Sequence, residues 1–387
     1  MYIKNIKIRN FRNIEKLDIS LDKNVNIFIG KNAQGKTSIL ESIYVLALSK
    51  PSRNIDDFSL VKNGYDFTRV IGDIRVNRTN KKLDFLINKG VKTLKINNND
   101  IKKVSDYISN LNIIMFSPDD LDVIKKSPIV RRNLINTTLC QLFPNYLRVL
   151  NEYNKLLKIR NEYLKNNYEK IDRTYLDIIT DNLVDRALVV MSYREKFITF
   201  VNSSIDGIYE KIMKQKGLNV RYIKSIDSND KEYIKKLYKD NFYNEVNKKM
   251  TLFGPHRDDI DFYIDDMNIK LYGSQGQQRV SILAFKLSLI TIFKESTGNY
   301  PVVLLDDIFS ELDLEKRKNL LKFVKSNIQF IITTTDLNNI GKKLIEKAKI
   351  FEIIDGKVKE GKKHGKEWKF RTLWFFWYSS FRGTWGC

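Results

Sequence analysis

Four residues near the N-terminus have the types and spacing that suit binding of a phosphorylated ligand. They are Gly30, Gly35, Lys36 and Thr37, which match the pattern G-x-x-x-x-G-K-[ST] of a phosphate-binding loop. The glycines let backbone N–H groups converge on one phosphate, the lysine reaches the β- and γ-phosphates, and the threonine hydroxyl is a Mg²⁺ ligand. The pattern predicts a nucleoside triphosphate site, and a plain Gly/Lys turn is the alternative.

A second group of this kind lies in the C-terminal third, where the apolar run 301–305 ends in Asp306 and Asp307. A buried parallel strand that delivers carboxylates at its C-terminal end is what a Mg²⁺–nucleotide site needs. We expect Asp306 to hold the metal with its water shell and Asp307 to polarise the attacking water as general base. Together with the loop, these acids predict a Mg²⁺–ATP site.

Two further stretches could contact an anion. Ser274 precedes an apolar run at helical spacing, 280–293, and is a natural N-cap whose first-turn amides, near Gly276, would face an anion. An ordinary capped helix is the alternative. The hexapeptide GPHRDD, 254–259, holds His256, which could contact a phosphate or simply form a turn.

Strands and helices alternate around these residues. Ranges 2–8 and 17–29 predict strands, and the helix after the loop ends before Lys50-Pro51, because a residue that precedes proline avoids the α region. Residues 68–97 predict an antiparallel meander. Apolar strands interleaved with helices predict a mainly parallel α/β nucleotide-binding sheet. The remaining strands of this prediction are 111–116, 301–307 and 329–335, with a closing hairpin at 350–361.

The range 145–249 has a different composition, because glycine and proline nearly vanish from it. Its apolar residues recur at helical spacing and predict a helical segment interrupted near 216–230. One apolar face has a single basic interruption, and it consists of Leu147, Leu150, Tyr153, Leu157, Arg160 and Leu164. We interpret this face as helix–helix packing.

The totals narrow the class of protein. The 387 residues carry a formal net charge of +22, which favours a polyanionic partner, with a lysine-rich composition from codon bias as the alternative. The sequence has no run of about 18 apolar residues and no signal-like N-terminus, so we expect no membrane span and a cytoplasmic location. Cys140 and Cys387 form neither a disulfide framework nor a zinc motif.

Six motifs in order resemble the RecF family of bacterial DNA replication and repair ATPases, a branch of the SMC-like, ABC-type ATPases. They are GKNAQGKT, SPDDLDVIKKSPIVRRNLI, GPHRDD, LYGSQGQQR, LLDDIFSELD and TTTD, and the resemblance covers about residues 1–361. It implies an ABC-type, SMC-like P-loop ATPase head made of residues 1–115 and 250–361. A mostly α-helical arm domain, 116–249, is expected between these two parts.

The resemblance also implies that ATP is held between the two subunits of a homodimer. One subunit supplies the nucleotide side, which comprises Gly30, Lys31, Asn32, Ala33, Gln34, Gly35, Lys36, Thr37, Ser38, Arg12, Asp306 and Asp307. The other supplies a signature in trans, consisting of Ser274, Gln275, Gly276, Gln277 and Gln278. Thr335 and Asp336 occupy the switch position after the last strand.

The implied function is that of an ATP-gated dimer that binds duplex DNA at single-strand gaps and is released by slow, DNA-stimulated ATP hydrolysis. The family works with RecR and RecO in loading RecA and in the SOS response. The alternatives are a transporter ATPase, which would carry Leu-Ser-Gly-Gly-Gln where this chain has Gly-Ser-Gln-Gly-Gln, and an SMC-like tether, which needs a far longer coiled coil.

Two positions and the tail depart from the family. Lys126 stands where the family usually has glycine, and Asn136 stands where it often has aspartate. All four tryptophans, together with several phenylalanines, fall in the last 20 residues. We therefore expect the tail 362–387 to be foreign to the fold, as a frameshifted, read-through or vector-derived end. A membrane-interface or partner-binding tail is the alternative.

Overall fold

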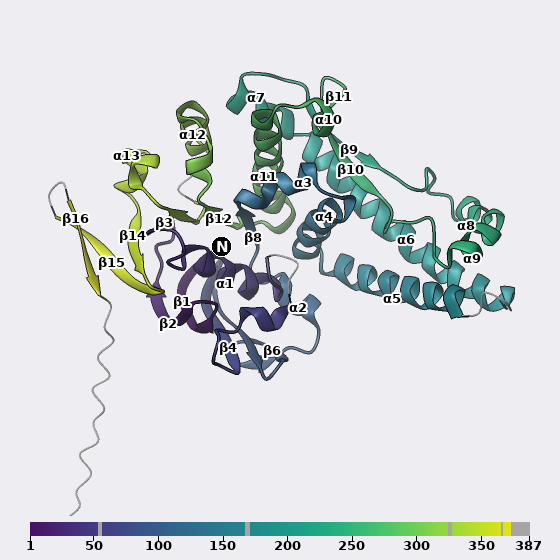
Figure 1. Ribbon diagram of the computed structural model, residues 1–387, viewed down its shortest axis with the longest axis horizontal. Coiled ribbons are helices and arrows are strands. Elements are labelled where there is room, and N and C mark those ends of the chain that lie inside the picture. Colours follow the sequence, from purple (N-terminus) through teal and green to yellow (C-terminus); the bar gives the residue numbers. More distant parts are fainter. Residues whose placement is uncertain (53–55, 167–170, 324–326, 365–366, 373–387) are drawn as a thin grey trace, which may run out of the picture.

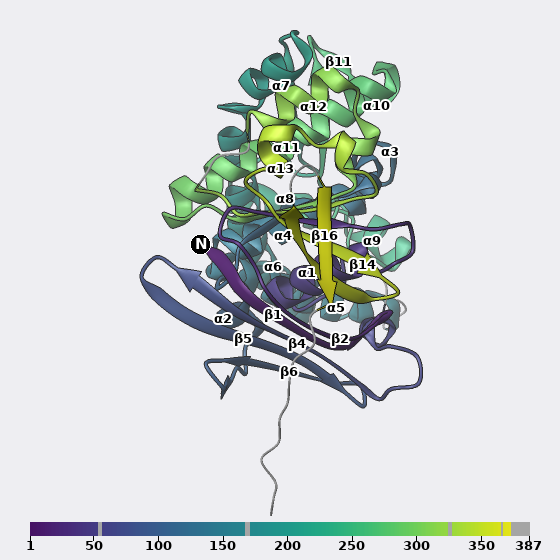
Figure 2. The same ribbon diagram turned by 90° about the vertical axis from the view of Figure 1, so that its left-hand side faces the viewer.

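Helix α1 (Lys36–Leu48) lies between two β-sheets, and its N-terminus is the end of the predicted phosphate loop (Figure 1). The computed structural model describes residues 1–52, 56–166, 171–323, 327–364 and 367–372. Figure 2 shows the antiparallel sheet along the lower edge of the head and the helices α11, α12 and α13 above. A long helical arm extends to one side of this head (Figure 1).

The antiparallel sheet confirms the strand predicted at 2–8, the first part of the strand predicted at 17–29, and the predicted meander. The last part of 17–29 forms a separate strand of the second sheet. The strand order of the antiparallel sheet is β2-β1-β4-β5-β6-β7. A register shift between Ile3 and Asn5 keeps the isoleucines at 3, 6 and 8 on the buried face. Its strands are β1 (Tyr2–Phe11), β2 (Ile14–Ser20), β4 (Phe67–Val76), β5 (Thr79–Asn88), β6 (Val91–Ile96) and β7 (Asn99–Asp100).

The second sheet combines both ends of the chain in the order β16-β15-β14-β3-β13-β12-β8, with a parallel centre from β14 to β8. Alternate residues of β12 enter different cores: Val302 and Leu304 face α1, whereas Val303 and Leu305 face α11 and the arm. Burial on both faces explains the continuous apolar runs. Its strands are β3 (Val25–Ile29), β8 (Ile113–Phe116), β12 (Val302–Asp306), β13 (Phe330–Thr334), β14 (Lys349–Ile354), β15 (Lys357–His364) and β16 (Glu367–Thr372).

Helices and single 3₁₀ turns connect the strands of the head. The longest is α11, which begins at the predicted N-cap and ends at Gly298 in a left-handed cap. The helices are α2 (Val104–Ile108), α11 (Gln275–Thr297), α12 (Leu314–Leu321) and α13 (Lys342–Ile345). The 3₁₀ turns are η1 (Asp57–Leu60), η2 (Pro118–Leu121), η3 (Ile308–Glu311) and η4 (Leu337–Asn339).

The arm is built on the antiparallel pair α5 and α6, as the helical spacing predicts. Arg160, the basic interruption of the apolar face, is 2% exposed and donates to Glu245 across 2.6 Å, so the charge is paired within the core. The arm helices are α3 (Asp122–Lys125), α4 (Pro128–Leu142), α5 (Pro144–Asn166), α6 (Arg173–Asn202), α7 (Ile205–Met213), α8 (Lys231–Asp240) and α9 (Phe242–Lys248). Within the described ranges no helix combines the length and apolarity needed to cross a membrane.

Strands pair across two of the predicted domain boundaries. β10 (Asp259–Ile264) pairs antiparallel with β9 (Leu218–Ile223) of the arm, and β11 (Met267–Asn268) and α10 (Ile269–Tyr272) follow it. The residues after 249 therefore first complete a three-stranded arm sheet, and the chain returns to the head only with α11. A period-2 pattern shows a strand but not its partner.

The other pairing crosses the predicted C-terminal boundary of the head. β15 continues past the predicted end at 361 to His364, and β16 pairs with it from Glu367 to Thr372. The first part of the predicted foreign tail thus adds an edge strand to the head sheet. The rest of the tail, 373–387, lies outside the described residues, and its origin stays a prediction.

Candidate nucleotide site

The phosphate loop, residues 30–37, leaves β3 and ends in the first turn of α1. A Cβ atom on Gly30 would lie 2.5 Å from the carbonyl oxygen of Ile353 in the neighbouring strand β14, so no larger residue fits. Gly35 has φ +105°, a left-handed conformation that favours glycine. These constraints support a cradle for phosphate over a plain turn.

The tip of the loop is anchored to the turn between β14 and β15. The N–H of Gly356 donates to the carbonyl oxygen of Gln34 at 3.0 Å, and the N–H of Asp355 donates to the Gln34 side chain. The residues before Gln34, which are Lys31, Asn32 and Ala33, are exposed, and Ser38 is half-buried in the first turn of α1. The C-terminal hairpin therefore supports the loop from outside.

Lys36 closes over its own loop. Its ammonium donates to the carbonyl oxygens of Gly30 at 2.6 Å and Lys31 at 2.8 Å. Burial lowers the pKa of Lys36, and the charges of Asp307 and Asp306 act against that shift. The positive charge thus lies between the loop and the two acids, where the β- and γ-phosphates of a nucleotide would need it.

Thr37 and Asp306 meet although they come from opposite ends of the chain. Thr37 Oγ1 donates to Asp306 Oδ1 at 3.1 Å, and Thr333 Oγ1 donates to the same oxygen at 2.7 Å. Burial raises the pKa of Asp306, while both hydroxyls lower it. A hydroxyl and a carboxylate that converge in this way are hard oxygen donors suited to Mg²⁺.

Asp307 follows with an unusual backbone and an unused acceptor. It has φ +49°, and its N–H donates to Thr333 Oγ1 at 3.0 Å. Its Oδ1 atom is buried and accepts no hydrogen bond from the part of the chain that the structure describes. A buried carboxylate oxygen without a donor is available to accept a proton from water, the role predicted for this residue.

Arg12 lies in the turn between β1 and β2 and contacts helix α1. Its guanidinium forms two hydrogen bonds to Glu41 of α1, at 2.9 and 3.1 Å, and one to the carbonyl oxygen of Ser59 at 2.8 Å. These bonds tie Arg12 to α1. The predicted approach of Arg12 to a nucleotide stays a prediction.

The predicted signature, residues 274–278, begins α11 with a complete capping box. Ser274 Oγ accepts from the N–H of Gln277 at 3.2 Å, and the Gln277 side chain accepts from the N–H of Ser274 at 2.9 Å. Gln275 is exposed, Gly276 is half-buried, and Gln278 is buried with its side-chain amide donating to α10. In both ribbon views α10, which leads into this segment, lies above the sheet and α1 below it (Figures 1 and 2).

The predicted switch residues follow β13 at the same edge of the sheet as the acids. Thr335 and Asp336 are both exposed. The Asp336 carboxylate accepts from the N–H of Asn338 at 2.9 Å and so caps η4. The structure brings them to the C-terminal edge of β13, beside β3 and β12. The carbonyl oxygen of the preceding residue, Thr334, accepts from the N–H of Gly30, at the start of the loop, at 3.3 Å.

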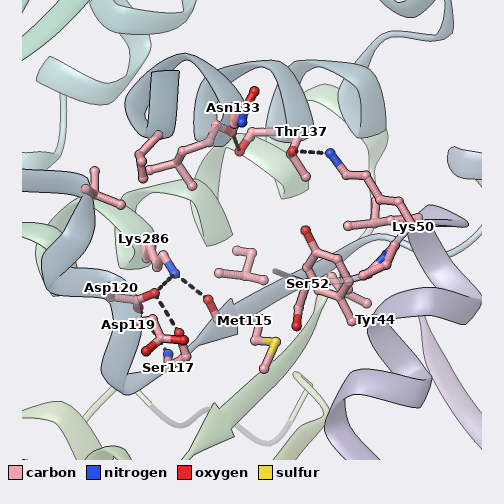
Figure 3. A pocket seen from close by; sticks show the side chains of 18 of the residues that line it. Tyr44, Lys50, Ser52, Met115, Ser117, Asp119, Asp120, Asn133, Thr137 and Lys286 are labelled. Carbon is pink, nitrogen blue, oxygen red and sulfur yellow. Dashed lines mark hydrogen bonds and ion pairs between the residues drawn. The ribbon is translucent and has the colours of Figure 1, made fainter. Parts of the chain in front are cut away.

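A cavity of about 1040 Å³ opens beside Thr37 and Asp306 (Figure 3). Its walls are the end of α1, strand β8 and helices α4 and α11. Lys50 crosses from the end of α1 to α4, where its ammonium donates to Thr137 Oγ1 at 2.8 Å. Lys286 of α11 donates towards β8 and η2. Neither lysine belongs to a motif from which a role in the site could be predicted.

The GPHRDD segment is a packing centre of the arm. Asp258 is 1% exposed and accepts from the Ser225 N–H at 2.8 Å and from the Tyr222 hydroxyl. Arg194 lies 3.6 Å from the same carboxylate and donates to Asn136 Oδ1 at 3.1 Å. The asparagine that departs from the family pattern therefore still offers an acceptor oxygen to this arginine.

Comparisons with known proteins agree with this geometry. The profile described as "RecF/RecN/SMC N terminal domain" matches residues 2–354. Two proteins named "DNA replication and repair protein RecF" are similar throughout. The one from Ligilactobacillus salivarius is 37% identical and covers 93% of this chain and 98% of its own. The one from Clostridium beijerinckii is 40% identical and covers 92% and 98%.

Solved structures give the same result. The structure described as "the recombination mediator protein RecF-ATP in RecFOR pathway" has a TM-score of 0.86 at 30% identity and covers 93% of this chain and 97% of its own. An Smc head bound to the C-winged helix domain of ScpA has a TM-score of 0.53 at 16% identity, which supports the fold alone. The chain has the ABC-type, SMC-like ATPase head fold and belongs to the RecF/RecN/SMC N-terminal domain family, within it to the RecF proteins.

Proposed function

We propose that this protein is an ATP-dependent DNA-binding protein of DNA replication and recombinational repair, and that ATP joins two copies of it. The carrying observation is the contact between Thr37 and Asp306, which assembles a phosphate loop and a metal-binding acid from opposite ends of the chain. The names of its RecF relatives and the ATP-bound RecF structure support the assignment.

The site fits ATP with Mg²⁺. Thr37 and Asp306 would hold the metal, which supplies positive charge to the β- and γ-phosphates; Mg²⁺ sites need only one or two protein carboxylates. Lys36 would exchange its two carbonyl acceptors for phosphate oxygens. The unused Oδ1 of Asp307 would accept a proton from the attacking water, which makes this residue the general base of a slow ATPase.

The second copy would complete the site. The N–H groups at the start of α11 form an anion receptor, and the bonds of Ser274 and Gln278 that the structure describes go to residues 269–277 rather than to the phosphate loop. Large apolar side chains are exposed in the elements next to this receptor: Leu271 and Tyr272 of α10, which leads into it, are 70% and 73% exposed, and Leu314 at the start of α12 is 70% exposed. Helix α12 comes close to the receptor, because the Lys316 ammonium lies 3.9 Å from where a Cβ atom on Gly276 would be. Such exposure beside an anion receptor favours a protein partner that brings the γ-phosphate with it.

The remaining assignments extend this proposal. The net charge of +22 favours a polyanionic partner. We take this partner to be duplex DNA, bound preferentially at single-strand gaps, as the resemblance to the RecF family implies. RecR and RecO are the proposed partners, RecA loading and the SOS response the proposed context, and the cytoplasm the location. The head would comprise the two terminal parts of the chain, with the arm as the insert.

Sedimentation with ATP or ADP, and with gapped, duplex or single-stranded DNA, tests the proposal. We expect ATP alone to produce a dimer, gapped and duplex DNA to bind that dimer, and Lys36→Ala to abolish both effects. DNA affinity should fall with salt at a log–log slope of about −0.9 per phosphate neutralised. A monomer with ATP, or a flat salt response, would contradict the proposal and favour another ABC-type machine.

A further inference from the structure

A buried lysine of helix α11 contacts strand β8, which is paired with the strand that ends at Asp306. Lys286 lies on α11, twelve residues after Ser274, which is about 18 Å along a helix. The residue is 6% exposed, and its ammonium donates to the Met115 carbonyl oxygen at 2.5 Å and to Asp120 Oδ1 at 2.6 Å. Figure 3 shows both contacts converging on one nitrogen atom.

Both acceptors lie at the C-terminal end of β8: Met115 is in the strand, and Asp120 is in the turn η2 that follows it. Met115 of β8 is in register with Leu304 of β12, and Phe116 is in register with Leu305. The next residue of β12 is Asp306. The ammonium of Lys286 therefore holds α11 to the strand next to the one that carries the metal acid.

Asp120 is itself fixed. Its carboxylate accepts from the Ser117 N–H and from the Ser117 hydroxyl, both at 3.1 Å, and so completes the capping box of η2. This turn forms one wall of the cavity whose lining also includes Thr37 and Asp306. One charged contact thus joins the turn, the strand and the signature helix beside the proposed Mg²⁺ position.

Stability alone does not explain such a pair. A buried ion pair is often no more stabilising than well-packed apolar residues of the same volume, because desolvation offsets the attraction. The pair instead determines a position: the Lys286 ammonium can reach the Asp120 carboxylate and the Met115 carbonyl oxygen together from only one place. The relative placement of the two connected elements is fixed with it.

We propose that Lys286 and Asp120 are positioning residues that set the signature helix relative to the metal side of the same subunit's nucleotide site. In a dimer, the start of that helix serves the partner's ATP. The link would therefore fix the distance between the phosphate loop and the signature within one subunit. When that loop binds nucleotide, the signature of the same subunit would be correctly placed against the nucleotide of the partner subunit. This inference rests on the proposed function.

The test is the double variant Lys286→Met with Asp120→Asn, which removes both charges and leaves an amide oxygen for the capping box. Nucleotide affinity of the monomer should stay within about twofold, because the phosphate loop is untouched. The kcat for ATP should fall by about tenfold to a hundredfold, and the ATP-dependent dimer should weaken, since misplacement by about 1 Å has effects of this size. Lys286→Arg, which keeps a donor and a charge, should recover part of the kcat.

A lysine–carboxylate pair in the arm, more exposed than the pair of Lys286 and Asp120, provides the control. Lys224 donates to Glu195 at 2.7 Å, and its double variant, Lys224→Met with Glu195→Gln, should keep kcat within twofold. Wild-type kcat and dimerisation in the folded Lys286 and Asp120 double variant would overturn the inference, as would an equal loss of nucleotide affinity and kcat. If the wild type itself neither dimerises with ATP nor hydrolyses it, the proposed function fails instead.

Discussion

The variant His256→Gln should be less sensitive to acid than the wild-type protein. The Nδ1 atom of His256 lies 2.6 Å from the Tyr153 hydroxyl, and Nε2 lies 3.2 Å from the Thr251 carbonyl oxygen. A carbonyl oxygen can only accept, so Nε2 carries the proton and Nδ1 accepts from Tyr153. A second proton, on Nδ1, would require the Tyr153 hydroxyl to change from donor to acceptor, and it would place a charge in a buried ring. The neutral ring is therefore the native form.

The size of the effect follows from the pKa of this ring. Burial lowers the pKa of His256 from 6.5 to about 4, with Arg257 and Arg132 adding to the shift and the Thr251 carbonyl acting against it. Between these values the unfolded chain binds a proton that the folded chain does not, so the free energy of unfolding falls as the pH falls. At pH 5 this one group costs about 2 kcal/mol, because a tenfold difference in proton affinity is worth about 1.4 kcal/mol. Above pH 7 the ring is neutral in both states and the cost vanishes.

Urea unfolding of both proteins at pH 8 and pH 5 measures this difference directly. The wild type should lose about 2 kcal/mol more than His256→Gln over this interval. The chain has two histidines, so NMR of ¹³C-labelled histidine, assigned with the variant, should show one ring that stays neutral down to about pH 5. Titration of His256 near pH 6.5, or equal acid sensitivity of the two proteins, would refute the reasoning. A large loss of DNA affinity in His256→Gln would instead support the phosphate contact that the sequence left open.

Three further variants test the nucleotide site and the arm. Lys36→Arg should keep weak ATP binding but lose hydrolysis, because a planar guanidinium does not replace the compact ammonium between loop and acids; unchanged phosphate release would exclude this loop as the site. Ser274→Arg should bind ATP as a monomer and fail to dimerise in sedimentation, and dimers of this variant would contradict the trans signature. Arg160→Met should cost about 3–5 kcal/mol of stability, because it leaves Glu245 buried and unpaired. Adding Glu245→Gln should recover most of that loss in urea unfolding, and equal instability of the two variants would assign the loss to packing.

The sequence predicts the parts of the site whose causes are local. A glycine-rich loop after an apolar strand, a serine before an apolar helix and two acids at a strand end each have their cause within about ten residues. The structure confirms the N-cap at Ser274 and the strand that ends at Asp306. The meander after α1 is confirmed for the same reason, because alternation and turns are local signals.

The parts that sequence analysis missed depend on distant neighbours. The loop motif predicts Gly30, but it does not predict that the carbonyl oxygen of Ile353, on a strand more than 300 residues later in the chain, leaves no room for a side chain there. β10 pairs with β9 across the predicted arm boundary, and an alternating pattern does not show which strand is its partner. Lys286 lies within an apolar run at helical spacing, where the sequence alone shows only a break in the pattern. Its role becomes visible only with its partner, Asp120, which is 166 residues away in the chain.

The strand order of the parallel sheet places both connections between arm and head next to Asp306. The chain leaves the head at the end of β8 and returns through α11 to β12, and these two strands are adjacent and parallel. The two segments that connect the arm to the head, the end of β8 and helix α11 with β12, therefore both lie beside Asp306, although about half the chain separates β8 from β12. The ion pair between Lys286 of α11 and Asp120 of η2 connects these two segments directly. A displacement of the arm would thus reach Asp306 through two neighbouring strand ends, without crossing the rest of the head.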